Sequence, residues 1–78
     1  MLVDIITPDA KLFSGDVLSL KLPSTNGSFE ILNDHAPIIS TLAAGDITVS
    51  LDNGQTESFT IHGGVIEMQN NKIIVLAD

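Results

Sequence analysis

No cysteine, tryptophan or tyrosine occurs among the 78 residues, and phenylalanine occurs only three times. Without cysteine the chain can form no disulfide and lacks the commonest ligands of structural zinc, two devices that often stabilise small domains. The length of 78 residues allows one domain, residues 1–78, with one core. Charged residues make up 17% of the sequence, below the roughly 25% of typical soluble domains, so we expect a protein-binding face.

Basic residues are also scarce. Lys11, Lys21 and Lys72 stand against ten acidic residues, and the formal net charge is -7. Nucleic acids and anionic lipids attract basic patches, so we predict binding to neither. No apolar run approaches the roughly 18 residues of a membrane span, and the first residues carry no basic segment, so neither direct lipid insertion nor a signal peptide is indicated. The net charge favours a basic partner.

Alternation of apolar and polar side chains predicts strands almost throughout the sequence. Leu18, Leu20 and Leu22 would share the dry face of a strand over residues 17–22. Phe59 and Ile61 would face inward from another over residues 57–62. Further strands are expected over residues 2–7, 11–13, 47–51, 65–69 and 72–76, and the last is apolar enough to be covered on both sides.

Turn-forming residues separate these strands. Asn53-Gly54 predicts a two-residue hairpin turn, Asn70-Asn71 predicts a second hairpin, and residues 14–16 predict a further turn. Residues 24–28 are polar and predict a protruding loop. The only stretch with a helical pattern, residues 38–44, is too short for a stable isolated helix. About eight or more short strands fit this length, which indicates an all-β sandwich or barrel.

Groups suited to catalysis or metal binding are few. A hydrolase would have to build its site from His35 and His62, the only histidines, and neither lies in a nucleophile-elbow sequence. A metal site that combined them with Asp34 or Glu67 has no supporting local spacing. Gly63-Gly64 is followed by neither a helix nor a lysine, so we interpret it as a bulge or close backbone approach rather than a phosphate cradle.

The segment His35-Ala36-Pro37 has two interpretations. Pro37 holds Ala36 in an extended conformation, which places the histidine at the end of a loop. The imidazole either anchors a turn through a hydrogen bond or contacts a partner from an exposed position. The sequence favours both interpretations about equally.

Three segments in order resemble one known family, the epsilon subunit of the F-type proton-translocating ATP synthase, in its N-terminal β-sandwich domain. The first is TPDAKLFSGD at residues 7–16, and the second, the most recognisable, is GSFEILNDHAPI at residues 27–38. The third is GGVIEM at residues 63–68, followed by NKIIVLAD at residues 71–78. The resemblance runs from one end of the sequence to the other.

The resemblance implies a flattened two-sheet antiparallel β-sandwich that catalyses nothing and needs no cofactor. Such a subunit turns with the rotor in the central stalk, binds the gamma subunit and the c-subunit ring, and couples proton-driven rotation to ATP synthesis. It reaches the remainder of the synthase through gamma. Its implied location is peripheral, on the cytoplasmic side of a bacterial energy-transducing membrane.

The resemblance also suggests which residues meet each partner. The c ring would face residues in one loop and the strand that follows it, namely Asn26, Gly27, Ser28 and Glu30. Gamma would approach His35, Ala36 and Ser40. Glu30 stands where the family usually has glycine, and Asn33-Asp34 where it has Pro-Gly or Pro-Asn, so the c-ring contacts are expected to differ in detail.

Family members commonly continue beyond the position of Asp78 into a pair of helices that restrain ATP hydrolysis. In some members these helices also bind ATP. The sequence ends at Asp78, so we expect neither a nucleotide site nor helical inhibition from these residues. The main alternative is a free-standing β-sandwich that binds a sugar or peptide. Such sites favour exposed tryptophan and tyrosine, which are absent.

Overall fold

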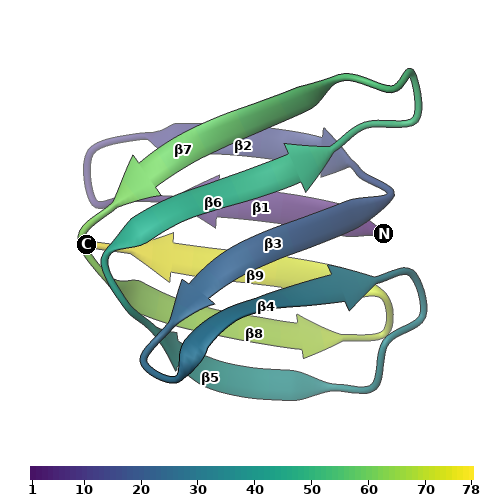
Figure 1. Ribbon diagram of the computed structural model, residues 1–78. Coiled ribbons are helices and arrows are strands. Elements are labelled where there is room, and N and C mark those ends of the chain that lie inside the picture. Colours follow the sequence, from purple (N-terminus) through teal and green to yellow (C-terminus); the bar gives the residue numbers. More distant parts are fainter.

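Figure 1 shows the computed structural model, which describes residues 1–78 as nine strands without a helix. No helix is therefore available to cross a membrane. The strands are β1 (Leu2–Ile6), β2 (Lys11–Asp16), β3 (Ser19–Ser24), β4 (Gly27–Leu32), β5 (Ile38–Leu42), β6 (Gly45–Ser50), β7 (Thr56–Ile61), β8 (Gly64–Gln69) and β9 (Lys72–Ala77).

Successive strands run in opposite directions along the molecule. Every connection between strands therefore lies at one of two ends. We call these the Met1 end and the Asp78 end, after the chain terminus that lies at each (Figure 1). The Met1 end carries the β2–β3 connection, the β4–β5 and β6–β7 loops, and the β8–β9 turn. The other four connections lie at the Asp78 end.

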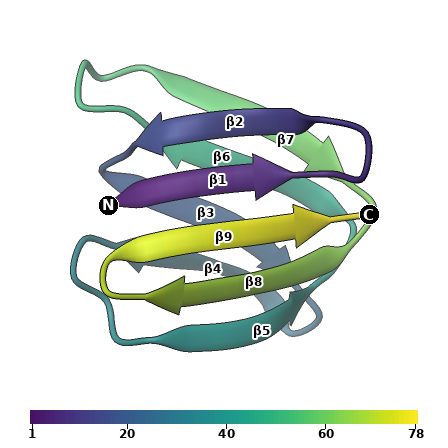
Figure 2. The ribbon, with the colours of Figure 1, turned by 180° about the vertical axis from the view of Figure 1, so that it is seen from behind.

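The strands form one hydrogen-bonded path that folds over into two layers. One layer has the order β2-β1-β9-β8-β5 and is nearest the viewer in Figure 2; the other has the order β7-β6-β3-β4. All pairs are antiparallel except β1 with β9. A single residue pair, Ser24 with Leu42, joins the layers through β3 and β5. The expected all-β, two-sheet sandwich is thus confirmed, with one parallel pair inside it.

The core lies between the layers and is entirely apolar, because every second side chain of each strand points inward. It consists of Met1, Val3, Ile5, Val17, Leu20, Leu22, Ile31, Leu42, Ile47, Val49, Ile61, Ile66, Met68, Ile73, Val75 and Ala77. The inward direction predicted for Ile61 and Phe59 is confirmed, although Phe59 is only partly buried. Ser58, Thr60 and His62 are exposed, as expected for the opposite face.

The strand expected over residues 17–22 differs from the prediction because the chain changes layers at its start. The Val17 N–H donates to the carbonyl oxygen of Met1 in one layer, and the Leu18 N–H donates to that of Ser50 in the other. The alternation therefore restarts between these residues. Val17 is buried, whereas Leu18 is 58% exposed instead of sharing the dry face of Leu20.

Several predicted turns also differ in detail. Residues 14–16 do not turn but complete β2, and residues 24–28 form only a two-residue turn between β3 and β4, with no protruding loop. The β6–β7 hairpin is confirmed, but residues 51–55 all lie in its loop, and there only Gly54 has a positive φ, of 84°. The turn at Asn70-Asn71 is confirmed, with φ of 53° and 60°.

Candidate functional site

Exposed apolar side chains gather on the outer face of β5, β8 and β9, which belong to the layer nearest the viewer in Figure 2. They are Ile39 (79% exposed), Leu76 (56%), Val65 (43%) and Ile74 (36%). Leu76 pairs with Val65, while Glu67 pairs with Ile39 on one side and Ile74 on the other. We call these four apolar residues the outer apolar patch. Because neighbouring strands present them side by side, they form a continuous surface with one carboxylate in its middle.

The prediction that both faces of β9 are covered is wrong for the isolated chain. Ile73 and Val75 are fully buried, but Ile74 and Leu76 alternate with them on the outer face and remain exposed. No second layer packs on that face. The continuous apolar run of β9 therefore contributes to both the core and the outer apolar patch.

The outer face of β6 and β7 is polar and suited to water. The Thr60 hydroxyl donates to the Asp46 carboxylate over 2.8 Å, and the hydroxyls of Thr48 and Ser58 lie 3.1 Å apart. Leu32 is the only large exposed apolar side chain in the strands of this layer, whereas the other layer has six. The two outer faces thus differ strongly, and exposed apolar area of this kind marks an interaction surface.

The four residues expected to face a c ring are all exposed. Asn26 and Gly27 lie at the β3–β4 turn at the Asp78 end, where the Asn26 N–H donates to the Ser24 hydroxyl over 3.2 Å. Gly27 has a φ of 109°, which favours glycine at this position. Ser28 and Glu30 follow on the outward face of β4.

The residues expected to meet gamma lie elsewhere. His35 and Ala36 are exposed in the β4–β5 loop at the Met1 end, and Ser40 is half-buried within β5. The His35 ring nitrogen Nδ1 lies 2.8 Å from the Ala36 carbonyl oxygen, so the imidazole has a local partner while it remains exposed. Because β4 separates this loop from the β3–β4 turn, the loop and the turn lie at opposite ends of the molecule.

The two histidines also lie apart. His35 is at the Met1 end, and His62, between β7 and β8, is at the Asp78 end. No group of three or more histidine, aspartate or glutamate side chains is close enough to hold a metal ion. A site that required both histidines cannot form in this arrangement.

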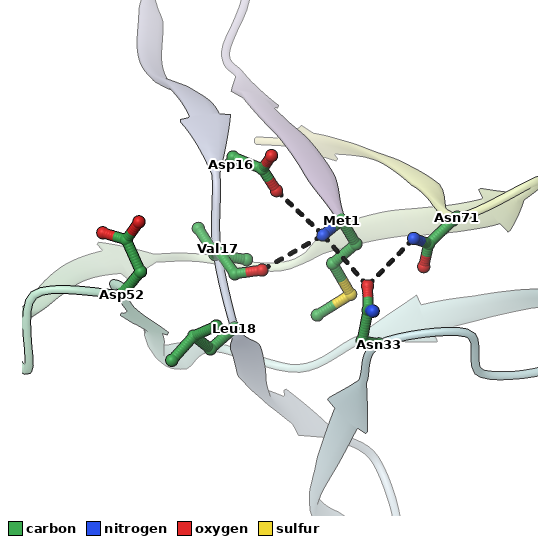
Figure 3. Close-up of a pocket in the computed structure, with 7 residues that line it drawn as sticks. All are labelled: Met1, Asp16, Val17, Leu18, Asn33, Asp52 and Asn71. Atoms are coloured by element: carbon green, nitrogen blue, oxygen red, sulfur yellow. Dashed lines mark hydrogen bonds and ion pairs between the residues drawn. The ribbon is translucent and has the colours of Figure 1, made fainter.

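A polar cluster at the Met1 end surrounds a cavity of about 420 Å³ (Figure 3). The α-ammonium group of Met1 donates to the Asp16 carboxylate over 2.9 Å, and to the Val17 carbonyl and the Asn33 side-chain oxygen over 3.2 Å each. The Asn71 side chain donates to the same Asn33 oxygen over 2.9 Å. Sequence reasoning missed this cluster because its members are far apart in the chain and share no local pattern.

The comparisons with known proteins agree with the fold. The family model described as "ATP synthase, Delta/Epsilon chain, beta-sandwich domain" matches residues 1–78. The chain belongs to this family. The ATP synthase epsilon chain of Chlorobium limicola is 40% identical over 76 residues, which cover 97% of this chain and 86% of the relative. That of Dichelobacter nodosus is also 40% identical, but this chain spans only 53% of it.

Two solved structures share the fold. A chain in the Euglena gracilis mitochondrial ATP synthase (OSCP/F1/c-ring) superposes with a TM-score of 0.90 at 17% identity, covering 96% of this chain and 48% of that one. A chain in the Tetrahymena thermophila mitochondrial ATP synthase central stalk and c ring superposes with a TM-score of 0.82 at 16% identity. That match covers 97% of this chain and 61% of the other. This member of the epsilon-chain family is a non-catalytic component of ATP synthase.

Proposed function

We propose that the chain is a rotor subunit of an F-type ATP synthase, which binds the gamma subunit and the c ring and couples proton-driven rotation to ATP synthesis. The observation that carries this proposal is the contrast between the outer apolar patch and the polar outer face of β6 and β7. A protein that only holds partners needs rigid surfaces and no reactive groups. Two layers of paired strands supply such surfaces.

Gamma is the proposed occupant of the outer apolar patch. Ile39, the most exposed apolar residue, lies between Ala36 and Ser40, which the family resemblance assigns to gamma. The patch, which extends from β5 over β8 and β9, therefore adjoins the loop that contains Ala36, whereas Ser40 pairs with the fully buried Ile66 and faces the inner side of the layer. Glu67 within the patch calls for a basic group on the partner, in line with the net charge of -7.

The c ring is proposed to meet the β3–β4 turn and the outward residues of β4. Asn26, Gly27, Ser28 and Glu30 are exposed and lie away from the patch, so both partners could bind together. Glu30 supplies a negative charge for basic groups in the polar loops of the ring. In this arrangement the chain is peripheral to the membrane, on the cytoplasmic side in a bacterium.

Binding to purified gamma tests the proposal. Leu76→Glu places a charge in the outer apolar patch at a position already 56% exposed, so the fold should tolerate it. We expect at least about a tenfold loss of affinity in calorimetry, because an interface that buries an unpaired charge loses more than about 1.4 kcal/mol. Ser58→Glu adds the same charge to the polar face and should leave the affinity unchanged.

The two possible failures differ. Equal affinity of the wild-type chain and Leu76→Glu for gamma would contradict the assignment of the patch. Lack of any binding between the wild-type chain and its cognate gamma would contradict the rotor function itself.

The c-ring contact has its own test. Glu30→Lys reverses a charge, and Ser28→Trp adds bulk, on the same exposed face of β4. Both variants should reduce the amount of chain that sediments with synthase-containing membranes and should lower proton-coupled ATP synthesis, with little change in unfolding. Glu57→Lys is a matched charge reversal on exposed β7 and should have no such effect. Unchanged coupling in both β4 variants would rule out this surface.

A further inference from the structure

The β4–β5 loop is exposed along its whole length, from Asn33 to Pro37. None of its side chains belongs to the core, so apolar packing does not fix its orientation. One backbone contact lies at its base, where the His35 N–H donates to the Leu32 carbonyl oxygen over 3.2 Å. The position of the loop must therefore depend on polar contacts with the rest of the molecule.

Asn71, from the β8–β9 turn, supplies those contacts. Its side-chain oxygen accepts a hydrogen bond from the Asp34 backbone N–H at 2.8 Å. Its side-chain nitrogen donates to the Asn33 side-chain oxygen at 2.9 Å, and that oxygen also accepts from the Met1 ammonium group. Figure 3 shows Asn71 and Asn33 turned toward each other across the cluster. One amide group thus holds two consecutive residues of the loop.

The backbone at this contact is unusual on both sides. Asp34 has a φ of 63° and Asn71 a φ of 60°, a left-handed conformation that few residues other than glycine, asparagine and aspartate adopt readily. Asp34 is also the residue whose N–H is bound by Asn71. The hydrogen bond therefore stabilises the loop where its backbone conformation is least favourable.

We infer that Asn71 is a positioning residue for partner binding: it holds the β4–β5 loop ready in the orientation that its partner recognises. This inference rests on the proposed function in one respect, that the loop with His35 and Ala36 meets gamma. A loop ordered in advance loses less conformational freedom on binding, so the affinity is higher than for a mobile loop. Asn71 would not need to touch gamma itself.

Two glycine substitutions separate this role from a general effect on the turn. Asn71→Gly removes both side-chain hydrogen bonds but keeps a residue that accepts positive φ, so the turn and the fold should persist. Asn70→Gly is the matched control, because Asn70 has a similar φ of 53° and its side chain makes no hydrogen bond within the chain. Asn33→Ala serves as a second variant, because it removes the side-chain oxygen to which Asn71 donates.

Amide hydrogen exchange measured by NMR reports on the loop, and calorimetry with gamma reports on recognition. In Asn71→Gly we expect the Asp34 N–H to exchange about tenfold faster, as befits the loss of one hydrogen bond, and gamma to bind about five- to tenfold more weakly. Asn33→Ala should weaken gamma binding in the same direction. Asn70→Gly should match the wild-type chain in both measurements.

Unchanged exchange at Asp34 in Asn71→Gly would overturn the inference that Asn71 orders the loop. Faster exchange together with wild-type affinity for gamma would overturn its role in recognition. If the wild-type chain does not bind gamma, the proposed function fails and the positioning role fails with it, while the exchange data still decide whether Asn71 orders the loop.

Discussion

At Gly64 the backbone of β8 lies so close to that of β9 that no side chain fits between them. A Cβ atom built there would collide with the carbonyl oxygen of Leu76 and lie 3.0 Å from the Cα of Ala77. The φ of 155° at Gly64 also favours glycine. The close backbone approach predicted from Gly63-Gly64 is therefore confirmed. Its partner, the end of β9, could not be read from local sequence.

Gly64→Ala should lower the free energy of unfolding by more than about 2 kcal/mol, because positive φ and a backbone collision act together. Gly54→Ala is the matched control: its φ is 84°, but no atom lies within 4 Å of the added carbon. That variant should lose only about 1 kcal/mol. Urea unfolding measures both values, and equal losses would show that the approach to β9 has no energetic effect.

At the scale of elements, β2 and β7 bury little: β2 has no fully buried residue and β7 has only one. Each ends one layer, and they meet on the side of the sandwich where no further strand covers the core. Phe13 from β2 and Phe59 from β7 close this side, with ring centroids 5.8 Å apart in a tilted arrangement. Both rings are only partly buried. By contrast, Ile61 at the end of β7 reaches the core and is 2% exposed.

This difference predicts unequal effects of two truncations in the same strand. Ile61→Ala should lower the free energy of unfolding by about 2–5 kcal/mol, the usual range for a buried large residue. Phe59→Ala should lower the free energy of unfolding by less than about 3 kcal/mol. This is less than truncation of a fully buried phenylalanine costs, because part of the Phe59 ring already faces water. A double-mutant cycle should give Phe13 and Phe59 a coupling of about 0.5–1.5 kcal/mol. A coupling of zero would mean that the rings do not hold the edges together.

Most strands of the second half could be predicted from sequence because alternation and turn residues are both local signals. Leu18 was misplaced because the change of layers between β2 and β3 is a tertiary event that restarts the alternation. The apolar run of β9 indicated two covered faces, yet sequence cannot say whether the second cover belongs to the same chain. Of the site, the exposed position of His35 was one of the two interpretations from sequence, whereas the role of Asn71 was not predictable, since its contacts with Asn33 and Asp34 join residues far apart in sequence.

At the scale of the whole molecule, a chain of 78 residues can form only a small hydrophobic core, so its stability on its own is expected to be low. The accessible surface of 4570 Å² includes the outer apolar patch, which gives no stability until something covers it. The net charge of -7 adds self-repulsion and attracts basic partners over distances longer than contacts. Stability and partner binding should therefore be linked, because gamma would recognise only the folded chain.

Gamma in excess should consequently raise the resistance of the chain to urea. At a free gamma concentration of about one hundred times the Kd, mass action adds about 2.7 kcal/mol to the free energy of unfolding, a large gain for so small a domain. Leu76→Glu should unfold like the wild-type chain when alone, because Leu76 is exposed, yet gain far less from gamma. Ser58→Glu should keep the full gain. If gamma stabilises the wild-type chain and Leu76→Glu equally, the complex forms through another surface, and the exposed face of β9 needs a different explanation.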